Sequence, residues 1–190
     1  MASDASTILV TGRNNKGQLG LGHTNDPVKT WSELAVPGRV QEVVFGELHG
    51  MILLEAGTVY TSGRNNEGQL GLGDTNDRSS FTQVGGALEG KNVVKIACGS
   101  NHSGALTDAG ELYLWGNGDR GQIGDGATSN RTTPTLVAGG ALGDGDGRIA
   151  AFDLGYKHTV ALTQDRRVLS WGNNVVGELG GDGVHGALQA

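Results

Sequence analysis

An eleven-residue stretch, Gly-Arg-Asn-Asn-Glu-Gly-Gln-Leu-Gly-Leu-Gly from Gly63 to Gly73, recurs along this chain and constrains its fold more than any other feature. Recognisable copies begin at Gly12, Gly63, Gly116 and Gly172, so they start 51, 53 and 56 residues apart. A second mark, Gly-x-x-His, keeps the same period and ends at His49, His102 and His158. Two marks with one period indicate internal repeats, which predict a propeller, a solenoid or an array.

Composition supports a folded chain with many tight turns. Glycine accounts for 35 of 190 residues, more than twice its average share of about 7%, while only 3 residues are proline and 36% are apolar. That apolar content is too high for a disordered chain, so the glycines serve backbone geometry at turns. The net charge of −6, without a long like-charge run, disfavours nucleic acid as a partner.

Each period contains four short segments with strand character. Segments that precede the glycine loop are 8–11, 58–62, 111–115 and 167–171; those that follow it are 31–34, 81–84 and 133–137. The most apolar segments are 40–45, 93–98 and 149–154, and the segments after the histidines are 50–54, 103–106 and 159–162. No window has a helical pattern of sufficient length, and we expect the loop asparagines to adopt positive φ.

The repeat unit predicts an all-β fold. Four short antiparallel strands in 51 to 56 residues fit one blade of a β-propeller, with the most apolar strand toward the interior. The chain holds about three to three and a half repeats, whereas closed propellers have about four to eight blades. We therefore expect one repeat domain over residues 1–190, forming an incomplete or partner-completed propeller. Its uncovered blades favour self-association, docking into a larger complex, or membership of a longer protein.

These marks together resemble a known repeat. The Gly-x-Asn-x-x-Gly-Gln-Leu-Gly loop, the Trp-Gly pairs at Trp115 and Trp171, and the Gly-x-x-His strand are similar to the repeats of the regulator of chromosome condensation family. The resemblance extends from about residue 8 to residue 181. It implies blades of a seven-bladed β-propeller, and it suggests guanine-nucleotide exchange on a small Ran-like GTPase, the activity of the family's best-known member.

The repeated side chains are best explained as structural. His49, His102 and His158 suggest a metal site, but equal spacing places them at equivalent positions on different blades. We predict that they hold loop backbone as neutral imidazoles and bind no metal. Trp115 and Trp171 are predicted to be packing residues. The four mark glycines are predicted to be structural turn positions, and no cofactor is expected; these glycines are Gly12, Gly63, Gly116 and Gly172.

Three further motifs give no chemistry on their own. The segment 116–121 matches G-x-G-x-x-G, but no helix follows it, so we interpret it as a repeat turn. The segment 144–147 begins like a calcium loop and lacks the acid expected about eleven residues later. Cys98 lies in an apolar run and is predicted to be a buried structural thiol. Ser103 and His102 would point to opposite faces of a strand, so no nucleophile and base are paired and we predict no enzyme.

Three functions remain after these exclusions. We favour a non-enzymatic protein–protein interaction or scaffold module, with guanine-nucleotide exchange and a structural subunit of a larger assembly as alternatives. Exchange needs a wedge, and the longest extra segment, 139–147, has no strand pattern. A single cysteine, no 18-residue apolar segment and no secretion signal predict an intracellular protein, cytoplasmic or nuclear, without a membrane segment. The sequence does not identify the partner-binding residues.

Overall fold

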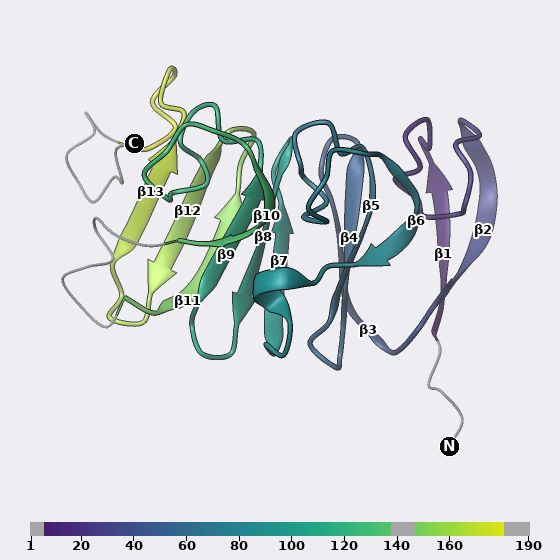
Figure 1. Cartoon of the computed structure of the whole chain (residues 1–190), viewed down its shortest axis with the longest axis horizontal. Coiled ribbons are helices and arrows are strands. Elements are labelled where there is room, and N and C mark those ends of the chain that lie inside the picture. The colour runs from purple at the N-terminus through teal and green to yellow at the C-terminus, as the bar shows by residue number, and fades with distance from the viewer. Residues whose placement is uncertain (1–5, 138–146, 181–190) are drawn as a thin grey trace.

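The computed structural model describes residues 6–137 and 147–180, which form thirteen strands in four antiparallel sheets standing side by side (Figure 1). We number these sheets as blades 1 to 4. Blade 1 contains β1 (Ser6–Gly12) and β2 (Val28–Val36). Blade 2 contains β3 (Val40–Phe45), β4 (His49–Leu54), β5 (Val59–Gly63) and β6 (Arg78–Gln83). Blade 3 contains β7 (Val93–Cys98), β8 (His102–Thr107), β9 (Leu112–Gly116) and β10 (Arg131–Leu136). Blade 4 contains β11 (Ile149–Leu154), β12 (His158–Thr163) and β13 (Val168–Gly172). The all-β prediction and the four-stranded antiparallel blade are confirmed.

Neighbouring strands within a blade follow each other in sequence, as in a series of hairpins. In blade 2 the order is β3-β4-β5-β6, and β4 pairs with β5 so that His49 lies opposite Gly63. In blade 3 the equivalent pair is His102 and Gly116. The two sequence marks therefore meet at one end of every complete blade. A single 3-10 turn, η1 (Gly86–Leu88), is the only helical element among the described residues.

The hydrophobic core is divided among the junctions between blades. One cluster of buried side chains joins blades 1 and 2, a second joins blades 2 and 3, and a third joins blades 3 and 4. Members of the first cluster include Val10 and Leu34 from blade 1 with Ile52 and Leu54 from blade 2. Because each blade buries its apolar side chains against the next, no blade has a core of its own.

The most apolar strands, β3, β7 and β11, lie at the sheet edge where neighbouring blades meet, since β7 contacts both β3 and β11, but they are not the most completely buried strands. All residues of β4 and β8 are buried, whereas β3 contains none that is fully buried. The reason is that the second strand of a blade is covered on both faces. In β4, Ile52 packs toward blade 1 and Met51 packs toward blade 3. The more apolar first strand lies instead at the edge of its sheet.

The loop asparagines also differ from expectation. Among the described residues, Arg166 is the only non-glycine with positive φ. Asn65 is fully buried and acts through its side chain: Nδ2 donates to the carbonyl of Asp74 at 3.0 Å, and Oδ1 accepts from the amide of Leu70 at 2.9 Å. The asparagine is therefore required as a hydrogen-bonding clamp that closes the loop.

Candidate partner-binding rim

Two sets of loops lie at opposite ends of the blades. The Gly-x-x-His turns and the long glycine-rich loops share one end, because the histidine that ends each turn pairs with the glycine that begins the loop. We call this end the histidine rim. The opposite end carries the tight turns between the second and third strands and the connections between blades. A partner that binds across blades must use one of these two ends or an outer face.

The three repeat histidines lie on different blades. His49 and His102 are buried, and His158 is half-buried. Among the described residues, no group of three His, Cys, Asp or Glu side chains is placed to hold a metal ion. The glycine that begins each turn packs on the imidazole, because a Cβ on Gly46 or Gly99 would collide with the ring of the same turn. That these three histidines bind no metal stays a prediction.

A hydrogen-bonded link between blades was not foreseen from the sequence. Nε2 of His49 lies 3.0 Å from the hydroxyl oxygen of Ser103 in the next blade. The Ser103 hydroxyl donates to the carbonyl of Gln69 at 2.8 Å, so His49 is the donor to Ser103. Both side chains are buried. The serine proton is committed to a backbone carbonyl and the facing imidazole nitrogen carries a proton, so this pair has no general base for nucleophilic chemistry.

Burial also determines the charge state of these imidazoles. Burial lowers the pKa of His49 to about 4. Burial, with smaller contributions from His49 and His158, lowers the pKa of His102 to about 3. Both imidazoles are consequently neutral near pH 7. The predicted hydrogen bonds to loop backbone are not found for either: His49 contacts the Ser103 hydroxyl through Nε2, and neither ring nitrogen of His102 has a hydrogen-bond partner within the described residues.

Trp115 and Trp171 also link neighbouring blades by hydrogen bonds. Nε1 of Trp115 donates to the carbonyl of Gln69 at 2.9 Å, beside the Ser103 hydroxyl. The arrangement recurs one period later, where Thr159 and Trp171 both donate to the carbonyl of Gln122, at 2.8 and 2.9 Å. Both indoles are fully buried. Each tryptophan therefore packs and also ties its own blade to the loop of the blade before it.

The mark glycines begin the loops that take part in these links. Their φ angles lie between +100° and +115°, a region that L side chains rarely adopt. Gly63, Gly116 and Gly172 end the third strands of blades 2, 3 and 4, and Gly12 ends the equivalent strand of blade 1, β1; each turns the chain into the loop. Their assignment as structural turn positions remains an interpretation of this geometry.

At the centre of the histidine rim, strand ends and turns of blades 2 to 4 enclose an open hollow of about 410 Å³. Its exposed aromatic side chains are Phe45, which is 48% exposed, and Tyr156, which is 68% exposed. The turns are fixed to each other, since the Glu47 amide donates to the Ser100 carbonyl at 3.2 Å and the Ser100 hydroxyl donates to the Glu47 carboxylate at 2.8 Å. This arrangement is a preformed surface with two exposed rings.

Two features adjoin that hollow. A second depression of about 400 Å³ shares Phe45 and Glu47 with it and extends to Trp31 of blade 1. Half-buried Cys98 lines the first hollow, and desolvation by burial raises the pKa of its thiol well above the ordinary value. The raised pKa keeps the thiol protonated at neutral pH. The prediction of a buried thiol is met only in part, because Cys98 is half-buried.

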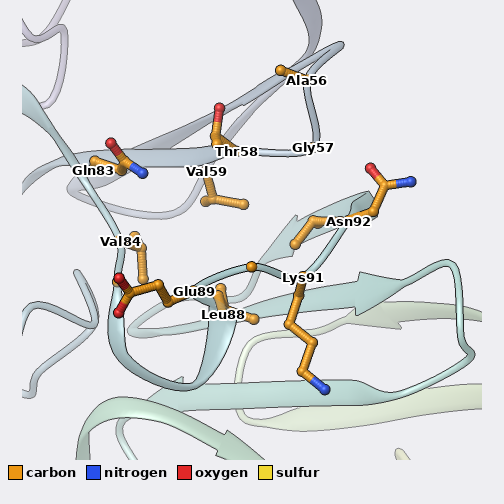
Figure 2. Close-up of a pocket in the computed structure, with 13 residues that line it drawn as sticks. Ala56, Gly57, Thr58, Val59, Gln83, Val84, Leu88, Glu89, Lys91 and Asn92 are labelled. Carbon is orange, nitrogen blue, oxygen red and sulfur yellow. The ribbon is translucent and has the colours of Figure 1, made fainter.

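The opposite end of the blades carries a larger hollow of about 690 Å³ (Figure 2). Its polar groups do not converge on a ligand position. Lys91 extends away from the other labelled side chains in Figure 2 and pairs with Glu111 at 2.7 Å. The Asn92 amide donates to Asp108 at 2.9 Å. Because the cation and the amide are engaged elsewhere, this hollow is the weaker candidate.

The remaining motifs find structural explanations or fall outside the described residues. The segment 116–121 follows β9 and leads through a loop to β10, so the dinucleotide fold is absent there. A Cβ on Gly118 would collide with the carbonyl of Ser129, which explains its middle glycine. The calcium-like segment lies outside the described residues apart from Gly147, and so does most of the extra segment 139–147. No helix in the described part of the chain has the length and apolar character of a membrane span.

Comparison with protein families gives a clear result. Two models, both described as the regulator of chromosome condensation repeat, match this chain. The first matches residues 56–106 and 109–162, which is more than half of the chain. The second matches residues 40–69, 93–122 and 149–178. Each match of the second model begins at or close to the first strand of a blade and ends in the following loop.

Individual relatives are similar over most of this chain but are much longer. The X-linked retinitis pigmentosa GTPase regulator of Canis lupus familiaris is 40% identical over 146 residues, covering 72% of this chain and 15% of that protein. The ultraviolet-B receptor UVR8 of Arabidopsis thaliana is 40% identical over 147 residues, covering 77% of this chain and 32% of that protein. Yeast RCC1 (Prp20), solved bound to Kap60, shares the fold with a TM-score of 0.72 at 22% identity, covering 88% of this chain and 40% of that one. The chain thus corresponds to part of a propeller.

Proposed function

This chain belongs to the regulator of chromosome condensation repeat family, and we propose that it is a non-enzymatic protein-binding module whose partner docks on the histidine rim. The observation that carries the proposal is the pair of exposed rings, Phe45 and Tyr156, around a hollow whose turns are fixed by hydrogen bonds. Aromatic side chains on a rigid surface are typical of protein interfaces, because they bury a large area at little entropic cost.

Two further observations support a binding function. The buried Ser103 and His49 pair lacks a base, so it offers no route to catalysis. Yeast RCC1 (Prp20), which shares this fold, was solved bound to the protein Kap60. The lone cysteine favours a reducing compartment, so we place the module inside the cell, in cytoplasm or nucleus.

We also infer that residues 1–190 form one repeat domain that works within a completed ring. The chain covers only 40% of the yeast RCC1 chain, and its outer sheets hold two and three strands among the described residues. A second copy, a larger complex or the remainder of a longer protein would complete it.

The binding proposal is tested by affinity capture from cell extract with the chain as bait. Tyr156→Ala removes the more exposed ring and should abolish capture of a specific protein. The matched control is Leu136→Ala, which removes an exposed apolar side chain from the outer strand of blade 3 and should leave capture unchanged. Equal capture by both variants contradicts the proposal.

Guanine-nucleotide exchange is the second candidate, because one relative that is 40% identical is named a GTPase regulator. Catalytic amounts of the purified chain should then accelerate release of labelled nucleotide from a small GTPase. Acceleration that survives Tyr156→Ala would replace the binding-module proposal with exchange at another surface.

A further inference from the structure

Every junction between blades buries the same loop. After each mark glycine, the segment Gly-Gln-Leu/Ile-Gly of one blade is covered by the next blade, and its residues are buried in the loops of blades 1, 2 and 3. In the loop of blade 4 the corresponding glycines, Gly177 and Gly180, are exposed, and a Cβ built on either would meet no atom within 4 Å. The fourth loop therefore presents an uncovered copy of a surface that is covered three times in this molecule.

The surface that covers each loop supplies the same two groups at every junction, a hydrogen-bond donor and an aromatic ring. At the junction of blades 1 and 2, the Ser62 hydroxyl donates to the carbonyl of Gln18 at 3.1 Å, and the ring of Phe81 occupies the space beside Gly20. At the next junction, Trp115 supplies both the donor, to Gln69, and the ring, which lies beside Gly71. Each junction thus places one aromatic ring on the second glycine and a donor on the carbonyl two residues before it.

Blade 1 carries the same groups on its uncovered face. Gly12 pairs with Val28 as Gly63 pairs with Arg78, so Thr11 corresponds to Ser62 and Trp31 corresponds to Phe81. Trp31 is 69% exposed, and Leu9 beside it is also exposed. We call the surface formed by Leu9, Thr11, Pro27 and Trp31 the head face. Its aromatic ring lies in the position that covers a glycine loop elsewhere in the chain, and its hydroxyl, on Thr11, donates to the Val28 carbonyl at 2.8 Å within the same blade.

Blade 4 carries the complementary apolar groups on its uncovered face. Val168 corresponds to Val59, and Leu162 corresponds to Leu53, both of which pack in the core between blades 2 and 3. Val168 is 66% exposed and Val176, in the loop, is 83% exposed. We call the surface formed by Leu162, Val168, Val176, Glu178 and Gly180 the tail face.

The residues equivalent to an ion pair at the junction of blades 1 and 2 are also complementary on the two end faces. Lys16 of the first loop lies 3.3 Å from Asp77, the residue immediately before β6. The residue at the position of Lys16 in the fourth loop is Val176, and the residue at the position of Asp77 before β2 is Pro27. An ion pair within the chain is thus replaced by two apolar residues on the end faces. Neither would leave an unpaired charge when the faces meet.

We propose that the head face of one copy of this chain docks on the tail face of a second copy, as if it were the next blade. In this contact Trp31 covers Gly180, and Pro27 packs on Val176. The Thr11 hydroxyl turns from the Val28 carbonyl to donate to the carbonyl of Glu178. The contact deepens the proposed function, since it rests on the inference that the chain works within a completed ring. Head-to-tail contacts are heterologous, so they close into a ring or extend into longer assemblies.

Light scattering on size-separated chain over a concentration series tests the contact. Wild-type chain should associate as concentration rises. Trp31→Asp on the head face and Val176→Asp on the tail face should each raise the dissociation constant by about tenfold or more, because they place a charge in an apolar contact. Val94→Asp, at an exposed apolar residue of blade 3 outside both faces, is the matched control and should associate as wild type does.

Mixing the two variants gives the decisive result. Trp31→Asp keeps an intact tail face and Val176→Asp keeps an intact head face, so together they should form a one-to-one heterodimer at concentrations where each variant alone is monomeric. A mixture that stays monomeric, or a wild type that is monomeric at the highest attainable concentration, overturns the head-to-tail contact. Partner capture through Tyr156 is measured separately, so its failure and the failure of this contact are distinguishable.

Discussion

Nε2 of His49 lies 3.0 Å from the hydroxyl oxygen of Ser103, a residue 54 positions later and in the next blade. Two blades are tied at this point by groups that have no contact with water. The same serine also donates to the loop carbonyl of Gln69. The Ser103 hydroxyl therefore links its own strand, β8, to β4 and to the glycine-rich loop of blade 2.

Replacing that hydroxyl should destabilise the chain. Ser103→Ala leaves the imidazole N–H of His49 and one bond of the Gln69 carbonyl without a partner, so we expect a loss of about 1–3 kcal/mol in the free energy of unfolding. Ser103→Thr should cost much less, because Thr159 occupies the equivalent position in blade 4 and makes the equivalent bond. Urea denaturation measures both variants. Equal stability of the two would show that the hydroxyl is unimportant.

The close approach of loop and tryptophan gives a second prediction. Gly71 has φ of +71° and a Cβ there would lie 2.7 Å from Nε1 of Trp115, whereas Gly73 has φ of +84° with its nearest neighbour at 3.9 Å. Alanine at either site incurs the cost of a left-handed residue, about 1–2 kcal/mol. Gly71→Ala should therefore lower the thermal midpoint clearly more than Gly73→Ala. A similar decrease for both would mean that the indole moves without cost.

The buried histidines should make stability depend on pH. Their pKa values, lowered to about 4 for His49 and about 3 for His102, lie below the value of about 6.5 expected in the unfolded chain. The unfolded state therefore binds more protons below pH 6.5, so stability is full above that pH and falls as the pH decreases toward 4. Urea titrations at several pH values measure the loss.

Substitution identifies which histidine carries that effect. His49→Gln should reduce proton uptake on unfolding by about one near pH 5, because one buried titrating group is removed. Thr24→Ala, in an exposed part of the first loop, removes no titrating group and should leave the uptake unchanged. If both variants show the wild-type slope, other groups cause the pH dependence.

The strands could be predicted from sequence, and the links between blades could not. Each strand was placed to within a few residues because a glycine mark ends the third strand and a histidine begins the second, both at fixed positions in the period. The contact of His49 with Ser103 depends on how one blade sits on the next, which no pattern within a single unit encodes. Comparing Ser103 with Thr159 at equivalent positions was the available signal, since both carry a hydroxyl.

Burial was harder to predict than strand position. Apolar content favours 40–45 as the inner strand, and β3 does contact β7 of the next blade, yet β4 is buried more completely because neighbouring blades cover both of its faces. The exposed Trp31 also looked unremarkable in sequence. Its meaning depends on the register that makes it equivalent to Phe81.

The single thiol gives a prediction for labelling. Burial raises the pKa of Cys98, so little thiolate is present near pH 8 and alkylation of the folded chain should be slow. Iodoacetamide labelling followed by mass spectrometry should show near-complete modification in urea and little without it. Rapid labelling of the folded chain would mean that the raised pKa does not protect this half-buried sulfur.

Because the glycines of the fourth loop are exposed, we expect local unfolding to begin in blade 4. Its amide of Gly177 reaches the carbonyl of Asn174 at 3.4 Å, whereas the equivalent bonds at Gly17 and Gly68 measure 2.9 Å. In an isolated chain, the amide hydrogens of this loop should exchange quickly with deuterium through local opening. Those of the covered loops should exchange more slowly, because their exchange requires neighbouring blades to separate. Exchange rates measured for each loop would thus show which neighbouring blade stabilises it.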